Sequence, residues 1–285
     1  MSNSLGFLGP PGTFTEEIAL KYSQDNSSLI LQEYTAIDEL MEDVDAGKVK
    51  MGIVPIENSL EGSVNITLDM FVQLNVYIYK ELIYPISHCL MALPGVKPEE
   101  IKEVYSHPQA FSQCRKYLKA NMPLVNQFPM ESTAMAAEKI SALGGPRAAI
   151  APRRAAKLFD LEILASDIQD GYEEENKTNL TRFVVVSSHD HSLTGTDKTS
   201  IIFSIKDSPG SLYHILGVFA KKAINLTRIE SRPARKRLGE YLFFVDFEGH
   251  REEKKSVQAL ELLEDQVKYL KMLGSYPSVY LPGNS

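Results

Sequence analysis

Cysteine is scarce in this chain, and no long apolar run occurs in it. The only two cysteines among the 285 residues, Cys89 and Cys114, lack CxxC spacing, so neither a disulfide framework nor a zinc site is expected. No segment approaches the roughly 20 apolar residues that a membrane-spanning helix needs, and the first residues lack the basic and apolar parts of a secretory signal. We therefore expect a cytoplasmic protein with reduced thiols.

An excess of basic residues is also missing. The formal net charge is −7 and the pI is near 5.5, which argues against a nucleic-acid or anionic-membrane partner, because either would require a basic face. With 44% hydrophobic and 24% charged residues, the composition is that of a globular protein. The length is sufficient for two domains with a core each.

The first part of the chain alternates between strand and helix patterns. Leu5 to Leu8 is a short apolar run closed by a Gly-Pro-Pro-Gly turn, Thr35 to Val49 has helical periodicity, and Met51 to Val54 is a second buried run. This alternation predicts an α/β fold with a largely parallel sheet. We expect the chain to cross into a second lobe between Val76 and Leu93 and to return through the apolar strand that ends at Val186.

A polar segment, 187–200, separates this part from a new set of elements and is interpreted as a linker. Beyond it the pattern predicts, in order, a strand at 201–205, a helix at 212–219, strands at 224–230 and 241–247, a helix at 252–263 and a strand at 267–273. The order βαββαβ is that of a ferredoxin-like domain.

Small polar side chains follow the predicted strands of the first part. In open α/β sheets, ligands bind beyond the carboxyl ends of the strands, where helix N-termini offer free N–H groups. The segments concerned are Gly9–Glu16, Pro55–Ser59, Ser106–Gln109, Pro152–Arg154 and Asn179–Phe183. Together they predict a pocket for a small carboxylate, with Thr181 and Arg182 at its centre.

Each of these segments also has a simpler interpretation. The Gly9–Glu16 turn is neither a P-loop nor a GxGxxG motif, so it also fits an ordinary strand-to-helix turn. Ser106 is expected to cap a helix that runs through Leu118 and on which Gln109 and Gln113 share one face, and that face either lines the pocket or is solvated. Ser132 is expected to cap a further helix, which runs through Ile140. Glu57 and Asn58 fit either a proton donor with a carboxylate ligand or a capped turn.

The motifs in this order resemble one family. They are Gly9-Pro-Pro-Gly-Thr-Phe-Thr-Glu16, Pro55-Ile-Glu-Asn-Ser-Leu-Glu-Gly62, Ser106-His-Pro-Gln109, Ser132-Thr-Ala-Met-Ala-Ala137, Asn179-Leu-Thr-Arg-Phe183 and Glu230-Ser-Arg-Pro233. The chain resembles prephenate dehydratase with a C-terminal ACT regulatory domain. The resemblance implies an α/β fold: a bilobal catalytic domain similar to type 2 periplasmic binding proteins, and a ferredoxin-like βαββαβ ACT domain. The expected boundaries are 1–186 for the catalytic domain, with a second lobe at about 82–175, then 187–198 for the linker and 199–276 for the ACT domain. Because the first motif begins within ten residues of Met1, the monofunctional form is expected.

The resemblance also implies an activity and its control. The expected reaction converts prephenate to phenylpyruvate with loss of water and carbon dioxide, without cofactor or metal. L-Phenylalanine is the expected allosteric effector, bound between two ACT domains of a homodimer or homotetramer.

The family pattern assigns roles to residues of this sequence. The expected catalytic residues are Thr181, Arg182 and Glu57, with Thr181 as the proton donor to the leaving hydroxyl and the other two polarising it. The expected substrate-binding residues are Thr13, Asn58, Ser59, Ser106, Gln109, Gln113, Asn179 and Phe183. The expected effector-binding residues are Gly210, Ser211, Leu212, Asn225, Leu226, Glu230, Ser231, Arg232 and Pro233.

One departure and two alternatives stay open. The effector motif is commonly Gly-Ala-Leu in the family and stands here as Gly210-Ser-Leu212, which leaves the strength and sign of the control open. Arogenate, in which an amino group replaces the keto group of prephenate, is an alternative substrate. A non-catalytic amino-acid sensor on the same fold is the alternative from a different class, although the intact Thr181, Arg182, Glu57 and Asn58 argue against it.

Overall fold

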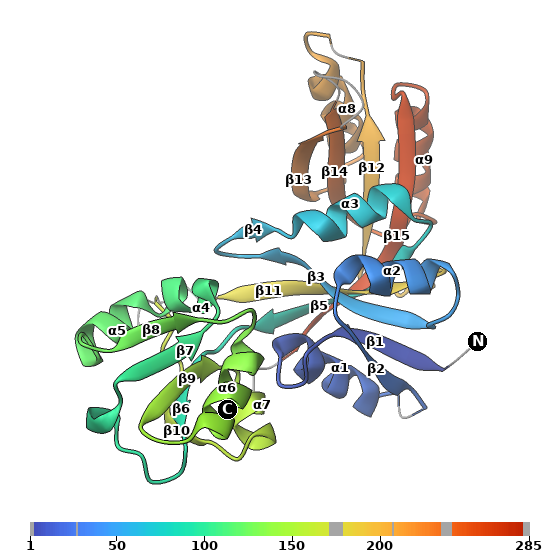
Figure 1. Ribbon diagram of the computed structural model, residues 1–285. Coiled ribbons are helices and arrows are strands. Elements are labelled where there is room, and N and C mark those ends of the chain that lie inside the picture. Colours follow the sequence, from blue (N-terminus) through green and yellow to red (C-terminus); the bar gives the residue numbers. More distant parts are fainter. Residues whose placement is uncertain (1–2, 27, 171–178, 207, 235–240, 282–285) are drawn as a thin grey trace.

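The computed structural model has three parts, two lobes and a C-terminal domain, and it describes residues 3–26, 28–170, 179–206, 208–234 and 241–281. Two sheets organise these parts (Figure 1). The larger follows the order β13-β14-β12-β15-β5-β11-β3-β1-β2, with β4 paired to β3, and the smaller follows β10-β6-β9-β7-β8. The predicted α/β fold class is confirmed.

The first lobe is built from both ends of the catalytic region. Its elements are β1 (Ser4–Leu8), α1 (Phe14–Gln24), β2 (Ile30–Tyr34), α2 (Ile37–Asp45), β3 (Met51–Asn58), β4 (Gly62–Ser63), α3 (Asn65–Gln73), β5 (Tyr77–Pro85) and β11 (Leu180–Ser187). Strand β1 pairs in parallel with β2 and β3, whereas β11 runs antiparallel to both β3 and β5. The sheet is therefore mixed, and the prediction of a largely parallel sheet is wrong, because the returning strand β11 runs antiparallel to both of its neighbours. The apolar run Val184 to Val186 is fully buried at its centre.

The second lobe is a single continuous insertion between β5 and β11. Its elements are β6 (Cys89–Ala92), the 3₁₀ turn η1 (Pro98–Glu100), β7 (Glu103–Ser106), α4 (Pro108–Gln113), α5 (Arg115–Asn121), β8 (Asn126–Pro129), α6 (Thr133–Leu143), β9 (Arg147–Ala151), α7 (Arg153–Leu158) and β10 (Glu162–Ala165). The chain leaves the first lobe after Pro85, a few residues later than expected, because β5 keeps its pairing with β11 to that residue. The expected end of this lobe, at about 175, lies outside the described residues. Cys89 and Cys114 are buried free thiols in this lobe.

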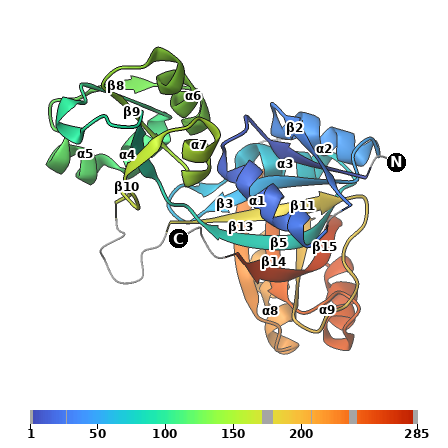
Figure 2. The ribbon, with the colours of Figure 1, turned by 90° about the horizontal axis from the view of Figure 1, so that it is seen from below.

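The C-terminal part has the predicted βαββαβ order. Its elements are β12 (Asp197–Ser204), α8 (Ser211–Lys221), β13 (Leu226–Pro233), β14 (Tyr241–Glu248), α9 (Lys254–Glu264) and β15 (Tyr269–Tyr280). One face of this sheet packs Ile201 and Phe203 against α8 and α9. The opposite face packs Ile202 and Phe244 into the core of the first lobe, because successive strand residues point to opposite faces. Figure 2 shows this domain against the first lobe and away from the second.

Strand β15 is longer than the sequence pattern predicts. Within the larger sheet it joins the strands of the C-terminal domain to those of the first lobe. It pairs with β12 from Tyr269 to Pro277 and then with β5 from Ser278 to Tyr280. At Gly274 the strand lies so close to β5 that a Cβ would be 2.5 Å from the carbonyl oxygen of Ile78. This close approach requires glycine, and the pairing of Ser278–Tyr280 with β5 makes the first lobe and the C-terminal domain one continuous sheet.

Candidate functional site

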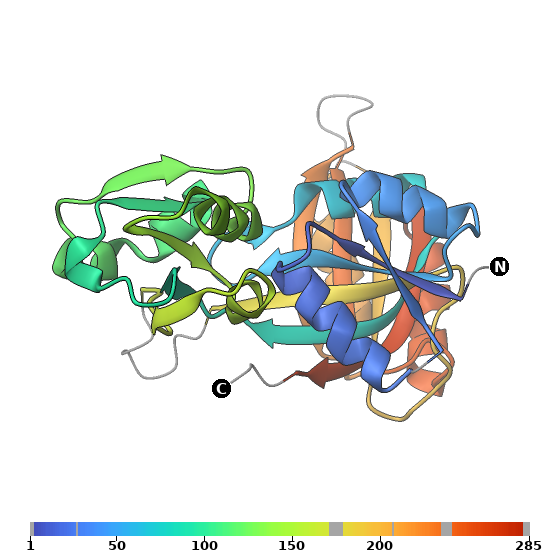
Figure 3. The ribbon, with the colours of Figure 1, turned by 60° about the horizontal axis from the view of Figure 1, so that its bottom comes forward.

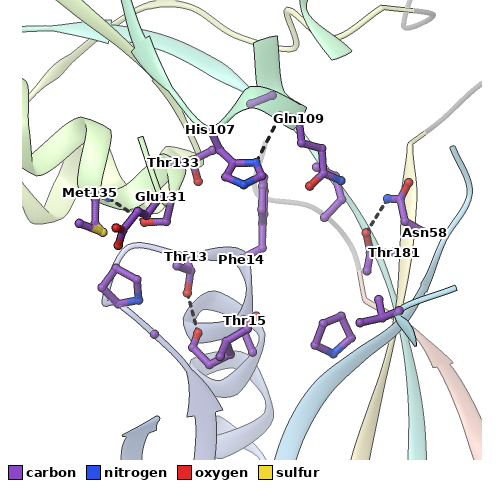
Figure 4. A pocket seen from close by; sticks show the side chains of 18 of the residues that line it. Thr13, Phe14, Thr15, Asn58, His107, Gln109, Glu131, Thr133, Met135 and Thr181 are labelled. Atoms are coloured by element: carbon purple, nitrogen blue, oxygen red, sulfur yellow. Dashed lines mark hydrogen bonds between the residues drawn. The ribbon is translucent and has the colours of Figure 1, made fainter. Parts of the chain in front are cut away.

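A cleft of about 650 Å³ lies between the two lobes. Its walls come from β1, α1, β3, α4, α6 and β11, as the close view shows (Figure 4). It is lined by Leu8, Gly9, Pro10, Thr13, Phe14, Thr15, Glu33, Thr35, Pro55, Asn58, Val64, Ile86, His88, His107, Gln109, Ala110, Gln113, Glu131, Ser132, Thr133, Met135, Thr181 and Phe183. Of the predicted catalytic and substrate-binding residues, six line it: Thr13, Asn58, Gln109, Gln113, Thr181 and Phe183.

Three helices begin at this cleft, and each has a side-chain cap. The Thr13 hydroxyl accepts a hydrogen bond from the N–H of Glu16 (3.3 Å) at the start of α1. The Ser132 hydroxyl does the same for Met135 (3.0 Å) at the start of α6, as predicted. No lysine or arginine is among the described residues that line the cleft. Positive potential for an anion therefore comes from the helix N-termini α1 and α6.

The third cap differs from the prediction. Helix α4 begins at Pro108 and is capped by the ring of His107, whose Nδ1 accepts from the N–H of Gln109 (3.2 Å). Ser106 instead ends β7, is fully buried, and donates to the carbonyl oxygen of Ile150 (2.7 Å). Ser106 therefore ties β7 to β9 beneath the cleft. The proline one residue after His107 fixes the helix start there, because proline suits the first helical position.

The hydroxyl of Thr181 is held in one orientation by Asn58. The side-chain oxygen of Asn58 accepts from the backbone N–H groups of Leu60 (2.9 Å) and Glu61 (3.1 Å). Its NH₂ group must therefore face Thr181 Oγ1 and Asn179 Oδ1, both at 2.8 Å. Because Oγ1 accepts this hydrogen bond, the Thr181 proton stays available for donation to a ligand in the cleft.

The same reasoning extends along a chain of amides that crosses between the lobes. The Asn179 oxygen is occupied by Asn58, so its NH₂ donates to Gln113 Oε1 (3.1 Å), and the Gln113 NH₂ donates to Glu61 Oε1 (3.2 Å). His88 Nε2 also lies 2.9 Å from Gln113 Oε1 and must donate to it. His88 is thus the Nε2–H tautomer. Burial lowers its pKa, opposed by the hydrogen bond to Gln113, which favours the neutral ring.

His88 and Glu61 were not among the predicted site residues. Glu61 falls inside the Pro55–Gly62 motif, so the motif itself carried a signal for it. His88 lies in the short connection between β5 and β6 and is 3% exposed. Nothing in its local sequence pattern distinguishes it from a packed core residue.

The structure does not bring Arg182 or Glu57 into the cleft. Strand neighbours point to opposite faces, so Thr181 faces the cleft while Arg182 faces the C-terminal domain. There Arg182 pairs with Glu81 (2.5 Å) and Asp246 (2.6 Å) and lies 3.5 Å from Glu57. Arg182 and Glu57 were expected to polarise the Thr181 hydroxyl from within the cleft. Neither residue lines the cleft.

Two further predicted residues support the cleft without lining it. Asn179 is buried behind Thr181 as a member of the amide chain. Ser59 lies on the surface, where its Oγ accepts from the N–H of Leu180 (3.0 Å) and its own N–H donates to the Leu180 carbonyl (2.8 Å). Both residues fix the first residues of β11, and Figure 3 shows this strand entering the first lobe from the side of the second.

The predicted effector residues lie at two separate places on one chain. Gly210, with φ of +83°, begins α8 beside a pocket of about 410 Å³. The lining residues are Ile205, Lys206, Ser208, Gly210, Ser211, Leu212, Tyr213, Tyr241 and Phe243. None of the predicted residues from Asn225 to Pro233 lines this pocket. Leu226 packs against the domain core, and Asn225 donates to Glu248 (3.0 Å).

The second group of effector residues belongs to β13. Glu230 and Arg232 face the first lobe, where Glu230 accepts from Ser63 and Arg232 pairs with Asp69 (2.9 Å). Ser231 and Pro233 alternate with them and are exposed. The two halves of the predicted effector site are therefore apart within one chain.

Among the described residues, no group of three or more His, Cys, Asp or Glu side chains has the arrangement of a metal site. In that same part of the chain, none of the helices combines the length and hydropathy needed to cross a membrane.

Two α/β lobes that close on an anion-compatible cleft, with a βαββαβ domain on the same sheet, define a small-molecule enzyme with an attached regulatory domain. The prephenate dehydratase family model matches residues 5–191, and the ACT domain model matches residues 199–265. The chain belongs to the prephenate dehydratase family.

Individual relatives agree with the family models. The chain is 44% identical over 279 residues to a bifunctional chorismate mutase/prephenate dehydratase of Aquifex aeolicus, covering 97% of this chain and 74% of the relative. It is 38% identical over 291 residues to a prephenate dehydratase of Methanocaldococcus jannaschii, covering 97% and 99%. The crystal structure of prephenate dehydratase in complex with L-Phe from Arthrobacter aurescens is similar with a TM-score of 0.85 and 35% identity, covering 96% of this chain and 89% of that one.

Proposed function

We propose that this chain converts prephenate to phenylpyruvate and that L-phenylalanine controls the reaction. The ring hydroxyl leaves as water after taking up a proton, and the ring carboxylate leaves as carbon dioxide. The electron pair of the broken carbon–carbon bond enters the ring, which becomes aromatic. The reaction therefore consumes one proton for each substrate molecule and needs no redox partner.

The observation that carries this proposal is the orientation of Thr181. Its oxygen accepts from Asn58 (2.8 Å) and its side chain lines the cleft, so its proton can be aimed at a leaving hydroxyl. Donation in the transition state contributes roughly 10²- to 10⁴-fold in rate. Because threonine is a weak acid, the proton it gives is replaced from solvent.

The two carboxylates of prephenate find complementary groups around the cleft. The N-termini of α1 and α6 supply backbone N–H groups next to the caps Thr13 and Ser132. Amide side chains, Gln109 and Gln113, line the opposite wall. A fixed cation against the departing carboxylate would stabilise the substrate more than the transition state and slow the reaction. The described lining, which has no lysine or arginine, suits a carboxylate that must leave.

Replacement of the hydroxyl tests this role directly. Thr181→Val keeps the size and shape of the side chain and removes the proton donor, so we expect kcat to fall roughly 10²- to 10⁴-fold, measured by phenylpyruvate absorbance. Thr181→Ser keeps the hydroxyl and is the matched control, with most of the activity retained. A valine variant that folds normally and keeps kcat within about tenfold would contradict the assignment.

Arogenate is the second candidate substrate, and one feature of the cleft favours testing it. Glu33 and Glu131 both line the cleft, and a carboxylate there would favour the ammonium group that arogenate carries in place of a keto group. Parallel assays with prephenate and arogenate compare the two kcat/KM values. A larger value for arogenate would reassign the substrate, and no turnover of either would favour the non-catalytic sensor.

Control by phenylalanine is proposed to require a second chain. The pocket at Gly210 and the exposed face of β13 are apart in one chain, so pairing of two ACT domains would place one beside the other. We propose a homodimer or homotetramer for this reason. Light scattering with and without phenylalanine, together with the activity assay, tests both statements. A monomer that phenylalanine still inhibits would contradict the shared site. The cytoplasmic location stays a prediction, supported by the two buried free thiols.

A further inference from the structure

A cluster of buried charges lies behind the cleft, on the face of the sheet opposite Thr181. Its central member is Arg182, whose side chain is 12% exposed. Arg182 pairs with Glu81 of β5 (2.5 Å) and with Asp246 of β14 (2.6 Å), and it donates to the hydroxyl of Tyr276 on β15 (3.0 Å). One guanidinium therefore joins the catalytic strands to two strands of the ACT domain.

Asp246 is held in this position from within the ACT domain. It is 3% exposed, and its other oxygen accepts from the Ser200 hydroxyl (2.5 Å) of β12. Burial alone would raise the pKa of Asp246, but the guanidinium groups of Arg182 and Arg228 outweigh it and hold the pKa below its usual range. Asp246 is thus a charged partner for Arg182 that the ACT domain supplies and orients.

A second set of ion pairs connects the ACT domain to the strand that carries Asn58. Glu57 precedes Asn58 on β3, and its carboxylate lies 3.3 Å from the guanidinium of Arg228 on β13. Arg228 in turn pairs with Glu230 (2.5 Å) of the predicted effector motif. Thr181 and Asn58 therefore each have a strand neighbour that is paired with the ACT domain. The neighbour of Thr181 is Arg182, and that of Asn58 is Glu57.

Strand β11 pairs regularly with β5 from Leu180 to Val185, but its pairing with β3 is not a regular ladder at this point. Arg182 is opposite Glu57 and Phe183 is opposite Pro55, so Ile56 is an extra residue on β3. Such bulges change the direction of side chains and often occur beside active sites. Because regular pairing is interrupted on the β3 edge, side-chain contacts have more influence on how Thr181 lies relative to Asn58.

We propose that Asp246 of the ACT domain positions Thr181 for catalysis through Arg182. The proposal rests on the proposed function, since it concerns the same hydroxyl. Arg182 is a positioning residue and does not touch the substrate. A shift of the ACT sheet moves Asp246, Arg182 follows because the ion pair is buried, and the adjoining Thr181 shifts relative to the leaving group. Misplacement of about 1 Å can cost roughly 10²-fold in rate.

If the cluster only stabilised the fold, its loss would lower thermal stability without changing the chemistry of the folded enzyme. If it positions Thr181, its loss would also change catalysis. The test therefore compares kcat with KM in folded protein, because loss of a transition-state interaction lowers kcat while KM stays nearly constant.

The variant pair is Asp246→Asn and Asp190→Asn. The Asp190 side chain is 10% exposed, pairs with Arg251 (2.7 Å), and accepts from the backbone N–H of Ser275, so Asp190→Asn matches the loss of one largely buried, paired carboxylate outside the Arg182 cluster. We expect Asp246→Asn to lower kcat roughly 10- to 100-fold with KM within about threefold, and Asp190→Asn to leave both near the parent values. Equal losses in both variants, or an unchanged kcat in Asp246→Asn, would overturn the proposal.

A milder change decides the matter if Asp246→Asn does not fold. Tyr276→Phe removes only the hydroxyl that accepts from Arg182 and contacts Ser200 (2.5 Å). We expect a smaller fall in kcat, of about threefold to tenfold, again with KM nearly unchanged. A kcat equal to that of the parent would overturn the proposal.

Amide hydrogen exchange separates this inference from the proposed function. A peptide that covers 180–187 should exchange faster in Asp246→Asn than in the parent, and at the parent rate in Asp190→Asn. This measurement needs no substrate. If the parent turned over no prephenate, the proposed function would fail, and the exchange rates alone would decide whether the ACT domain holds β11. Equal exchange in parent and Asp246→Asn would overturn the coupling.

Discussion

Two backbone N–H groups determine the orientation of three amides near Thr181, those of Asn58, Asn179 and Gln113. Because Leu60 and Glu61 donate to the oxygen of Asn58, each later side chain has only one orientation that satisfies its neighbour. This series of hydrogen bonds ends at His88, which must donate from Nε2 to Gln113. A proton added to the His88 ring would therefore place a charge in a buried position with no charged partner among the described residues, which is costly.

The buried histidine leads to a prediction about pH. Because burial lowers the pKa of His88 in the folded state, the unfolded state takes up a proton first as the pH falls. Stability from His88 is complete above the unfolded pKa of about 6.5 and is lost below it, by up to about 1.4 kcal/mol per pH unit. His88→Gln keeps a donor toward Gln113 and cannot titrate.

Urea unfolding of parent and His88→Gln at a series of pH values between 7.5 and 5 measures this difference. We expect the free energy of unfolding of the parent to fall more steeply than that of the variant. Parallel curves would show that His88 takes up a proton equally well in both states.

The sequence contained part of the site and missed the rest for identifiable reasons. Motifs indicated Thr181 and Asn58, and the helical spacing from Gln109 indicated Gln113, all of which line the cleft. The alternation of a strand could have placed Arg182 on the opposite face from Thr181, since neighbours never share one. Its partner Asp246 could not be predicted, because local periodicity does not specify which distant strand supplies a buried charge.

Helices and strands followed the sequence where one apolar face determined them. Alternating residues such as Ile201 and Phe203 predicted the ferredoxin-like strands, and Ser132 predicted the start of α6. The break between α4 and α5 at Cys114 was missed, because the apolar spacing continues through it. The extension of β15 was also missed, because Gly274 and Pro277 indicate the end of a strand unless a second sheet lies beside them.

Gly274 tests whether the long β15 depends on close approach to β5. With φ of +131° and a Cβ position 2.5 Å from the Ile78 carbonyl oxygen, alanine would be strained and would also collide with backbone. We expect Gly274→Ala to lower the free energy of unfolding by about 2 to 3 kcal/mol, measured by urea denaturation.

A glycine in open space is the matched control. A Cβ at Gly217 within α8 would meet nothing within 4 Å, so alanine should raise helix stability by about 0.5 to 1 kcal/mol. Opposite signs for the two variants are expected. A neutral Gly274→Ala would mean that β15 can separate from β5 at little cost.

In the whole molecule, the ACT domain and the first lobe are not independent bodies joined by a linker. They share the continuous sheet through β15, and Ile202, Phe244 and Tyr276 belong to the same apolar core as Val184. The buried charges of Arg182, Glu81 and Asp246 lie in the same contact. The communication proposed between the two sites would therefore have a packed core as well as ion pairs along its route.

This shared core predicts that the catalytic lobes are unstable alone, although the family model matches only as far as residue 191. A chain ending at 191 would expose the apolar side chains that now contact Phe244 and Tyr276, and would leave Glu81 without Lys198. Full burial of one large apolar side chain contributes about 1.5 to 3 kcal/mol, so we expect the thermal midpoint to fall by at least about 10 °C or the chain to aggregate. A chain ending at Pro277 is the control, since it keeps Phe244 and Tyr276 in the shared core and loses the pairing of Ser278–Tyr280 with β5, the hydrogen bond from Ser278 to Glu81 and the packing of Val279 and Leu281; its midpoint should fall by less than that of the 1–191 chain. Calorimetry of the three chains provides the comparison. A 1–191 chain as stable as the parent would mean that the ACT domain rests on the first lobe without stabilising it, and coupling would then depend on the charge cluster alone.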